Sequence, residues 1–209
     1  MITLTLRDTA IKISGEINKA LVKHINMAIA KNRGKVSKRF KNEVKGWLRQ
    51  SPEINSLLAQ GSPESLNAVF GLAPGAGNSA VDAIINSVVD SMQIKISKIS
   101  PRYRGEILFN FQENSLGNIL GLSEGHQITL FGEDLHWLNW LLTSGDAIVI
   151  KGFSYEPSKD GRSGGGTMKV GGSFRVPPEY AGVLGNNFIT RAFEGKDKEI
   201  FNILTQLLV

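Results

Sequence analysis

The chain of 209 residues contains no cysteine. This absence excludes disulfides, thiol nucleophiles, cysteine-ligated zinc and iron–sulfur clusters. Only three histidines are present, His24, His126 and His136, and none stands in a spacing that would place two imidazoles on one metal ion. We therefore expect neither a metal nor a cofactor, and we interpret the histidines as surface or boundary residues.

Long apolar runs are also missing. No segment approaches 18 uninterrupted apolar residues, and the beginning of the chain lacks the basic segment and apolar core of a secretory signal. Apolar residues make up 41% of the chain and charged residues 21%, which is ordinary for a globular protein and argues against wholesale disorder. We expect a soluble, unexported protein that has no membrane contact.

Two glycine motifs suggest enzymes, but their context does not fit. Gly121–Gly125 matches the G-x-S-x-G nucleophile elbow, although a strand is expected after the serine where the elbow requires a helix. Gly75–Ala80 matches the dinucleotide fingerprint, although the preceding residues have a helical pattern where that fingerprint requires a strand. The G-x-x-x-x-G-K-[ST] phosphate loop is absent. We therefore predict that the protein is not an enzyme.

The positive charge is concentrated near the N-terminus. Ten Lys and Arg residues lie between Ile17 and Gln50 against the single acid Glu43, whereas the whole chain carries a net charge of +5. Apolar residues recur there at steps of four and seven, which predicts an amphipathic helix over about residues 15–50 that Gly34 could bend. On the side opposite the apolar stripe lie the cations that we name the basic face: Lys31, Lys35, Lys38, Lys41, Lys45 and Arg49. This face is a solvated helix surface, a surface for a polyanion such as DNA or, least favoured because the apolar stripe lacks aromatic anchors, a surface for an anionic membrane.

The remaining pattern predicts an α+β protein. Residues 1–92 form a mainly helical front that carries the basic arm, after a short strand at 1–7, with helix starts at Ser51-Pro52 and Ser62-Pro63 and a helix capped by Asn78 or Ser79. Residues 93–209 form a body with a small antiparallel or mixed sheet and a C-terminal helix. Its predicted segments are a hairpin of strands 94–96 and 107–111, a strand at 127–131, a helix at 133–142, and strands at 147–155 and 167–176.

A glycine-rich loop lies between the last two strands. Six of the twelve residues from Gly161 to Gly172 are glycine. Its tip contains Arg162, Gly164, Gly165 and Gly166, which could hold an anion, become ordered against a neighbouring subunit, or form an idle hairpin tip.

An ordered series of segments in the second half resembles a known family. The segments are Trp137–Leu142, Gly145–Ile150, Gly161–Gly164, Phe174–Gly182 and Asn186–Phe193. Together they resemble a C-terminal block of minor virion proteins of tailed bacteriophages, in the neck and tail-completion group at the head–tail junction. The block covers roughly residues 135–195, and within it Pro177-Pro178 would hold an extended run and Asn187–Ile189 would anchor a short helix.

This resemblance implies a structural subunit without enzymatic activity, which forms a ring around the DNA channel of the virion. The implied partners are other copies of the chain, portal or adaptor proteins, tail terminator or tube proteins, and packaged DNA bound without sequence specificity. Assembly would take place in the host cytoplasm. A non-specific nucleic-acid-binding protein that uses the basic helix is the alternative interpretation.

Overall fold

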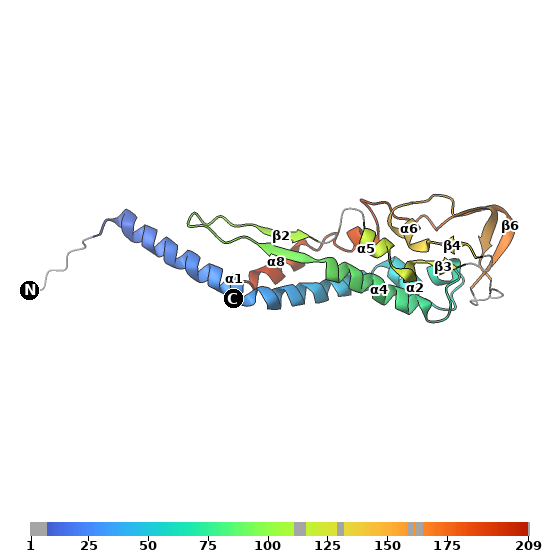
Figure 1. Cartoon of the computed structure of the whole chain (residues 1–209), viewed down its shortest axis with the longest axis horizontal. Coiled ribbons are helices and arrows are strands. Elements are labelled where there is room, and N and C mark those ends of the chain that lie inside the picture. Colours follow the sequence, from blue (N-terminus) through green and yellow to red (C-terminus); the bar gives the residue numbers. More distant parts are fainter. Residues whose placement is uncertain (1–7, 111–115, 129–131, 159–160, 162–164, 209) are drawn as a thin grey trace, which may run out of the picture. The chain divides into compact units, whose positions relative to one another are not determined.

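The structure is a computed structural model that describes residues 8–110, 116–128, 132–158, 161 and 165–208. Its helices are α1 (Ala10–Arg49), α2 (Pro52–Leu58), α3 (Leu66–Val69), α4 (Ala76–Ser91), α5 (Gly117–Leu120), the 3-10 helix η1 (Ser123–Gly125), α6 (Trp137–Leu142), α7 (Phe188–Arg191) and α8 (Asp197–Thr205). Its strands are β1 (Gln93–Ile96), β2 (Ile107–Asn110), β3 (Gln127–Ile128), β4 (Asp134–Leu135), β5 (Ile150–Glu156) and β6 (Thr167–Phe174) (Figure 1).

The predicted α+β class, with a long N-terminal helix and a C-terminal helix, is confirmed. Within the described residues the strands form three separate two-stranded antiparallel sheets, in which β1 pairs with β2, β3 with β4 and β5 with β6. The predicted hairpin after residue 92 is present, with Ile94 opposite Phe109 and Ile96 opposite Ile107. The strand predicted at 1–7 and the ends of two others, Phe111 and 129–131, lie outside the described residues.

The chain divides into two compact units, each of which is built from segments that are separated in the sequence. Unit 1 consists of Met1–Phe40, Gln93–Asn110 and Asp197–Val209, and unit 2 consists of Lys41–Met92 and Phe111–Lys196. One boundary falls at residue 92, where the sequence analysis divides the chain, but each unit takes segments from both sides of it. Helix α1 supplies residues to both units.

Unit 1 is held together by polar contacts to α1 and by few apolar ones. Asn26 donates to the Ile99 carbonyl at 3.0 Å and accepts from the Ile99 amide at 2.9 Å. Its side-chain amide therefore pairs with both backbone hydrogen-bonding groups of Ile99, in the segment between β1 and β2. Arg33 donates to the Ile94 carbonyl at 3.0 Å. Asn32 donates to the carbonyl of Leu207, beyond the end of α8, at 3.4 Å. The buried apolar side chains described in this unit are Val22, Ile29, Val36, Phe40, Ile203 and Leu207.

Unit 2 contains the main hydrophobic core. The predicted apolar face of α4 is buried, and α6 buries Trp137, Leu138, Leu141 and Leu142. Ser51 caps α2 as predicted, because its hydroxyl accepts from the Ile54 amide at 3.4 Å and Pro52 occupies the first helical position. Helix α6, the first segment of the C-terminal block, is therefore packed within this unit.

Two predicted helix starts are wrong. Ser62-Pro63 does not begin a helix, since Ser65 caps α3 by accepting from the Ala68 amide. Helix α4 is not capped by Asn78 or Ser79, because it begins after Gly75, which has φ of 83°. Glycine adopts this left-handed conformation without a steric penalty, so the chain enters the helix three residues earlier than a side-chain cap would allow.

The helix predicted at 133–142 is shorter than expected. Asp134 and Leu135 form β4, opposite Ile128 and Gln127, and α6 begins at Trp137. Glu133 thus precedes the strand and Asp134 lies on it, where cross-strand pairing takes the place of a first helical turn.

Candidate functional site

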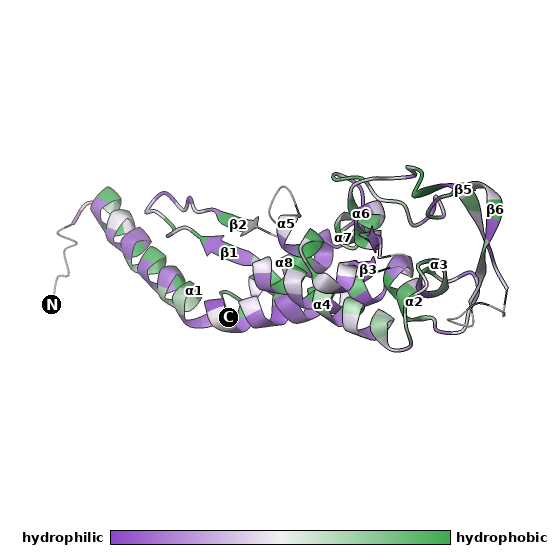
Figure 2. Cartoon of the chain, turned by 45° about the vertical axis from the view of Figure 1, so that its right-hand side comes forward, coloured by the Kyte–Doolittle hydropathy of each residue, from purple (hydrophilic) through white to green (hydrophobic). Residues whose placement is uncertain are grey.

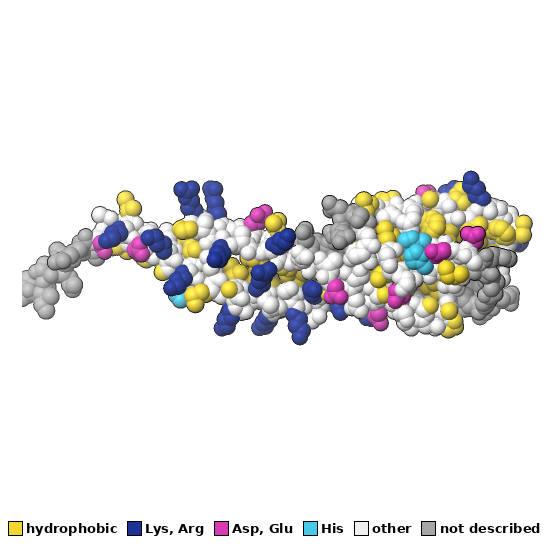
Figure 3. Space-filling model, in the orientation of Figure 1, with side chains coloured by type: hydrophobic (Ala, Val, Ile, Leu, Met, Phe, Trp, Pro, Cys, Tyr) yellow, Lys and Arg dark blue, Asp and Glu magenta, His cyan; other side chains and the backbone are white. Residues whose placement is uncertain are grey.

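The basic face predicted from the sequence lies on α1 as expected. At about 100° per residue, its six cations fall within an arc of about 120° that is opposite the buried Val36 and Phe40. Lys31, Lys35 and Lys38 belong to unit 1, and the other three cations belong to unit 2. Figure 3 shows Lys and Arg side chains standing out from α1 (dark blue).

The two groups of cations differ in what they contact. In unit 2, Lys45 donates to the Asn86 side chain at 3.1 Å and Arg49 lies 2.8 Å from the Asp82 carboxylate, so both attach α1 to α4. Lys31, Lys35 and Lys38 are exposed, and none of them forms an ion pair with another described residue. These three are therefore available to an external polyanion with their full charge, and the half-buried Lys41 likewise forms no ion pair with another described residue.

The tip of the glycine-rich loop is described in part. Arg162 and Gly164 lie outside the described residues. The Tyr155 hydroxyl lies 2.6 Å from the Gly165 carbonyl oxygen and 2.5 Å from that of Pro63, and burial raises the pKa of this phenol. A Cβ on Gly166 would overlap the Tyr155 ring. Close packing against Tyr155 thus explains the glycine at 166, while Gly165 supplies a carbonyl to the same hydroxyl.

The two enzyme-like motifs also have structural explanations. A Cβ on Gly77 would overlap the Leu57 carbonyl and the Asn67 amide, so this glycine permits close packing of α4 on α2 and α3. The Ser123 hydroxyl of the G-x-S-x-G match donates to Glu124 at 3.0 Å, and among the described residues no hydrogen bond joins this hydroxyl to a histidine ring. No group of three His, Cys, Asp or Glu side chains in the described part could hold a metal ion.

Two histidines come together although the sequence gives no spacing signal for it. The rings of His126 and His136 stack with centroids 4.0 Å apart, and the Nδ1 atom of His126 lies 2.9 Å from the Asp134 carboxylate. Burial lowers the pKa of His136, the positive charge of a protonated His126 lowers it further, and Asp134 opposes the shift. In Figure 3 this pair (cyan, right) lies beside acidic side chains (magenta).

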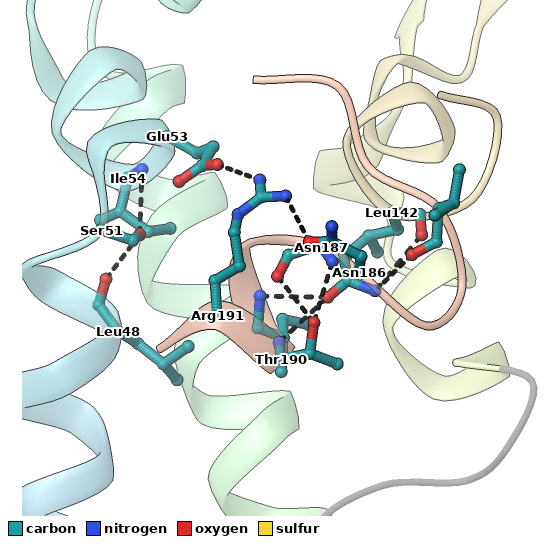
Figure 4. Close-up of polar contacts among 11 residues, drawn as sticks. Leu48, Ser51, Glu53, Ile54, Leu142, Asn186, Asn187, Thr190 and Arg191 are labelled. Atoms are coloured by element: carbon teal, nitrogen blue, oxygen red, sulfur yellow. Dashed lines mark hydrogen bonds and ion pairs between the residues drawn. The ribbon is translucent and has the colours of Figure 1, made fainter. Parts of the chain in front are cut away.

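A buried polar network links the C-terminal block to α2 (Figure 4). The fully buried Asn187 accepts from the Ile189 and Thr190 amides at 3.1 and 3.2 Å, which caps α7. Its Nδ2 atom donates to the backbone carbonyls of Val183, Leu184 and Leu142, at 3.1, 3.3 and 3.3 Å. One side chain therefore joins the turn before α7, the end of α6 and α7 itself.

An ion pair extends this network. The guanidinium of Arg191, which is 31% exposed, pairs with Glu53, whose side chain is only 2% exposed. Arg191 also donates to the Asn186 side chain at 2.9 Å. The anchoring by Asn187 is predictable from the sequence but the ion pair is not, because a contact between residues 138 positions apart has no local signal.

An apolar groove in unit 2 was not predicted. It has a volume of about 700 Å³ and lies between the segment after α3 and strands β3, β5 and β6. Its apolar lining includes Phe70, Leu72, Leu135, Ile150, Met168 and Phe174. The residues of β5 and β6 that line it come from two strands separated in the sequence, so they are brought together only by the pairing of these strands.

Charge and apolar surface are distributed unequally between the two units. Unit 1 has 14 Lys and Arg against 5 Asp and Glu, a net charge of +9, whereas unit 2 has 10 against 14, a net charge of −4. Among the described residues, unit 1 buries six apolar side chains and exposes these large ones: Ile11, Ile17, Leu21, Met27, Tyr103, Ile107, Leu108, Phe201 and Leu208. Unit 1 is therefore a basic module with much apolar surface still in contact with solvent.

Comparisons with protein-family models, with curated proteins and with solved structures found no match. In the part of the chain that the structure describes, no helix is both long and apolar enough to span a bilayer.

Proposed function

We propose that the chain is a structural virion protein of a tailed bacteriophage, a subunit that forms a ring at the head–tail junction around the DNA channel. Its partners there are other copies of itself, portal or adaptor proteins, tail terminator or tube proteins, and packaged DNA. The proposal starts from the resemblance of the block at about residues 135–195 to neck and tail-completion proteins. It includes no catalytic role.

The observation that carries the proposal is the division of charge and apolar surface between the two units. Among the described residues, the small unit 1 leaves nine large apolar side chains exposed, which supplies apolar surface for a partner to cover. A basic unit and an acidic unit on one chain favour contact between unlike surfaces of two copies. Contacts between unlike surfaces generate a closed ring when the rotation that relates one subunit to the next returns to the first subunit after a whole number of steps.

The structure of the block supports the same proposal. Helix α6 supplies four buried apolar residues, and Asn187 ties this helix to the segment around α7. The described segments of the block at 137–142 and 186–193 are thus joined within unit 2. Pro177 and Pro178 follow β6 and precede the turn that leads to α7.

A ring around a DNA channel also gives the cations of α1 a role. Lys31, Lys35 and Lys38 are exposed on one side of the helix, and lysines near phosphates attract DNA without reading its sequence. Weak attraction of this kind suits a channel through which DNA must pass.

The proposal is tested by the mass of the purified full-length chain. We expect native mass spectrometry and negative-stain imaging to show closed rings as the protein concentration rises, and an antibody to detect the chain in the virion fraction of a phage that encodes it. A chain that stays monomeric at high concentration, and that also fails to enter particles beside its partner proteins, would refute the proposal.

The alternative function, non-specific binding of nucleic acid by a free protein, rests on the same three lysines. It predicts tight binding of duplex DNA by a monomer or dimer, with log affinity falling by about 0.9 per phosphate neutralised for each unit of log salt. The triple variant Lys31→Gln/Lys35→Gln/Lys38→Gln should then have a shallower slope. The matched control is Lys45→Gln/Arg49→Gln, because these two cations are engaged with α4. A wild-type chain without DNA affinity at low salt would eliminate this alternative.

A further inference from the structure

The hairpin of β5 and β6 has one apolar face and one polar face. Phe153 lies opposite Val170, and Tyr155 lies opposite Met168, so these four side chains share a face. The other face carries Ser154, Glu156, Thr167 and Lys169, among which Lys169 and Glu156 form an ion pair at 3.3 Å. We call the first set the ribbon face.

The ribbon face is only partly covered within unit 2. Tyr155 and Met168 line the groove, but Val170 is 84% exposed, and Phe153 and Met168 are exposed as well. A two-stranded sheet is marginally stable in water unless its apolar face packs on something. The ribbon face therefore extends the groove into an open apolar surface, which is suited to an apolar partner of elongated form.

The N-terminal part of α1 offers such a surface. Ile13, Ile17 and Leu21 follow one another at four-residue steps and so lie on one side of the helix, with Ile17 53% and Leu21 48% exposed. The residues of α1 that face the core of unit 1, such as Val22 and Ile29, lie on a different side. We call Ile13, Ile17 and Leu21 the arm stripe, and Figure 2 shows hydrophobic residues (green) along this part of α1.

The two surfaces match in spacing, and the units that carry them have net charges of opposite sign. Residues four apart on a helix are about 6 Å apart along its axis, and residues two apart on a strand are about 6.8 Å apart, so successive stripe residues can meet successive ribbon residues. The arm stripe belongs to the unit with a charge of +9 and the ribbon face to the unit with a charge of −4. Opposite charge steers unlike units together.

We infer that the arm stripe of one copy packs on the ribbon face of the next copy. This inference rests on the proposed ring and names the surfaces that would form it. A second copy is the occupant because one chain carries both halves of the contact, an apolar stripe on a basic unit and an apolar face on an acidic unit. Because the two surfaces differ, each copy uses one and offers the other, which is the arrangement that a closed ring requires.

The absence of cysteine permits a clean cross-linking test. A Leu21→Cys chain is mixed with a Val170→Cys chain under oxidising conditions, and one of the two carries a mass tag so that the mixed dimer separates from the like-with-like dimers. We expect the mixed dimer to form efficiently. The matched control is Lys169→Cys, which neighbours Val170 on the opposite face of β6 and should not cross-link to Leu21→Cys.

A second measurement compares assembly of the wild-type chain with that of variants at exposed positions of α1, where a substitution should leave the fold intact. The double variant Ile17→Gln/Leu21→Gln should raise the protein concentration at half-assembly by about tenfold or more, since both side chains would be buried in the contact. Ile11 is 86% exposed and lies about 120° around the helix from Ile17, so Ile11→Gln should leave that concentration unchanged. Equal effects of the two variants would overturn the inference.

The remaining outcomes separate this inference from the proposed function. Rings that form without the cross-link between Leu21→Cys and Val170→Cys would overturn the named surfaces and leave the ring proposal intact. A cross-link that forms only within a monomeric chain carrying both cysteines would show that the arm covers its own ribbon face, and would also overturn the inference. A chain that never assembles would refute the ring proposal itself.

Discussion

Replacing Asn187 tests whether its buried side chain stabilises the C-terminal block to the extent that its contacts indicate. Asn187→Ala removes a helix cap, which contributes about 1 kcal/mol. It also removes an amide with two protons that are shared among three backbone carbonyls, and each lost hydrogen bond costs about 1 kcal/mol. The expected loss in the free energy of unfolding is about 3 kcal/mol, or about 10 °C in the melting temperature of a unit of this size.

The variant Asn187→Asp separates the two contributions. Aspartate caps helices as well as asparagine does, so it keeps the acceptor for the Ile189 and Thr190 amides. It cannot donate to the three carbonyls and brings negative charge close to their oxygens. We therefore expect a loss of at least about 2 kcal/mol despite the intact cap.

Tryptophan fluorescence during guanidinium unfolding is the appropriate assay. The chain has three tryptophans, Trp47, Trp137 and Trp140, and all belong to unit 2, so the signal reports the unit that contains Asn187. Asn42→Ala, at an exposed position of α1 in the same unit, is the control and should change stability by less than about 0.5 kcal/mol. A loss below 1 kcal/mol for Asn187→Ala, or wild-type stability for Asn187→Asp, would refute the reasoning.

Three further predictions concern other positions. Arg191→Met should destabilise unit 2 by about 2–3 kcal/mol in the same assay, because it leaves the buried Glu53 carboxylate unpaired. Adding Glu53→Gln should restore part of this loss, whereas additive losses in the double variant would contradict the pairing. Gly34→Ala should stabilise α1 by about 1 kcal/mol, measured by far-ultraviolet circular dichroism during heating, since a Cβ there meets open space; a loss of helicity would mean that the glycine is required. The pKa of His136 is lowered in the folded state, so the unfolded chain binds more protons as the pH falls. The contribution of His136 to the free energy of unfolding should therefore be fully present above a pH of about 6.5 and decrease below it. The variant His136→Gln should weaken this pH dependence, and the control His24→Gln should not.

Local patterns in the sequence were sufficient for the elements that depend on near neighbours. The four-residue steps of apolar side chains predict α1 and the buried face of α4, and Ser51-Pro52 predicts the start of α2. These features follow from hydrogen bonds and side-chain contacts within one helical turn. Asp134 shows where local patterns are insufficient, since its cross-strand pairing with Ile128 replaces the helical first turn that its sequence context favours.

The sequence by itself also determined the basic face of α1 and the absence of cysteine chemistry, because both depend only on residue type and helical periodicity. The tertiary structure alone decided which cations of that face are free, because Asp82 and Asn86, which engage Arg49 and Lys45, lie on another helix. It also decided the pairing of Glu53 with Arg191, the ribbon face and the division of charge between two units built from separated segments. Contacts between residues far apart in the chain depend on how the whole chain packs, and no local pattern encodes them.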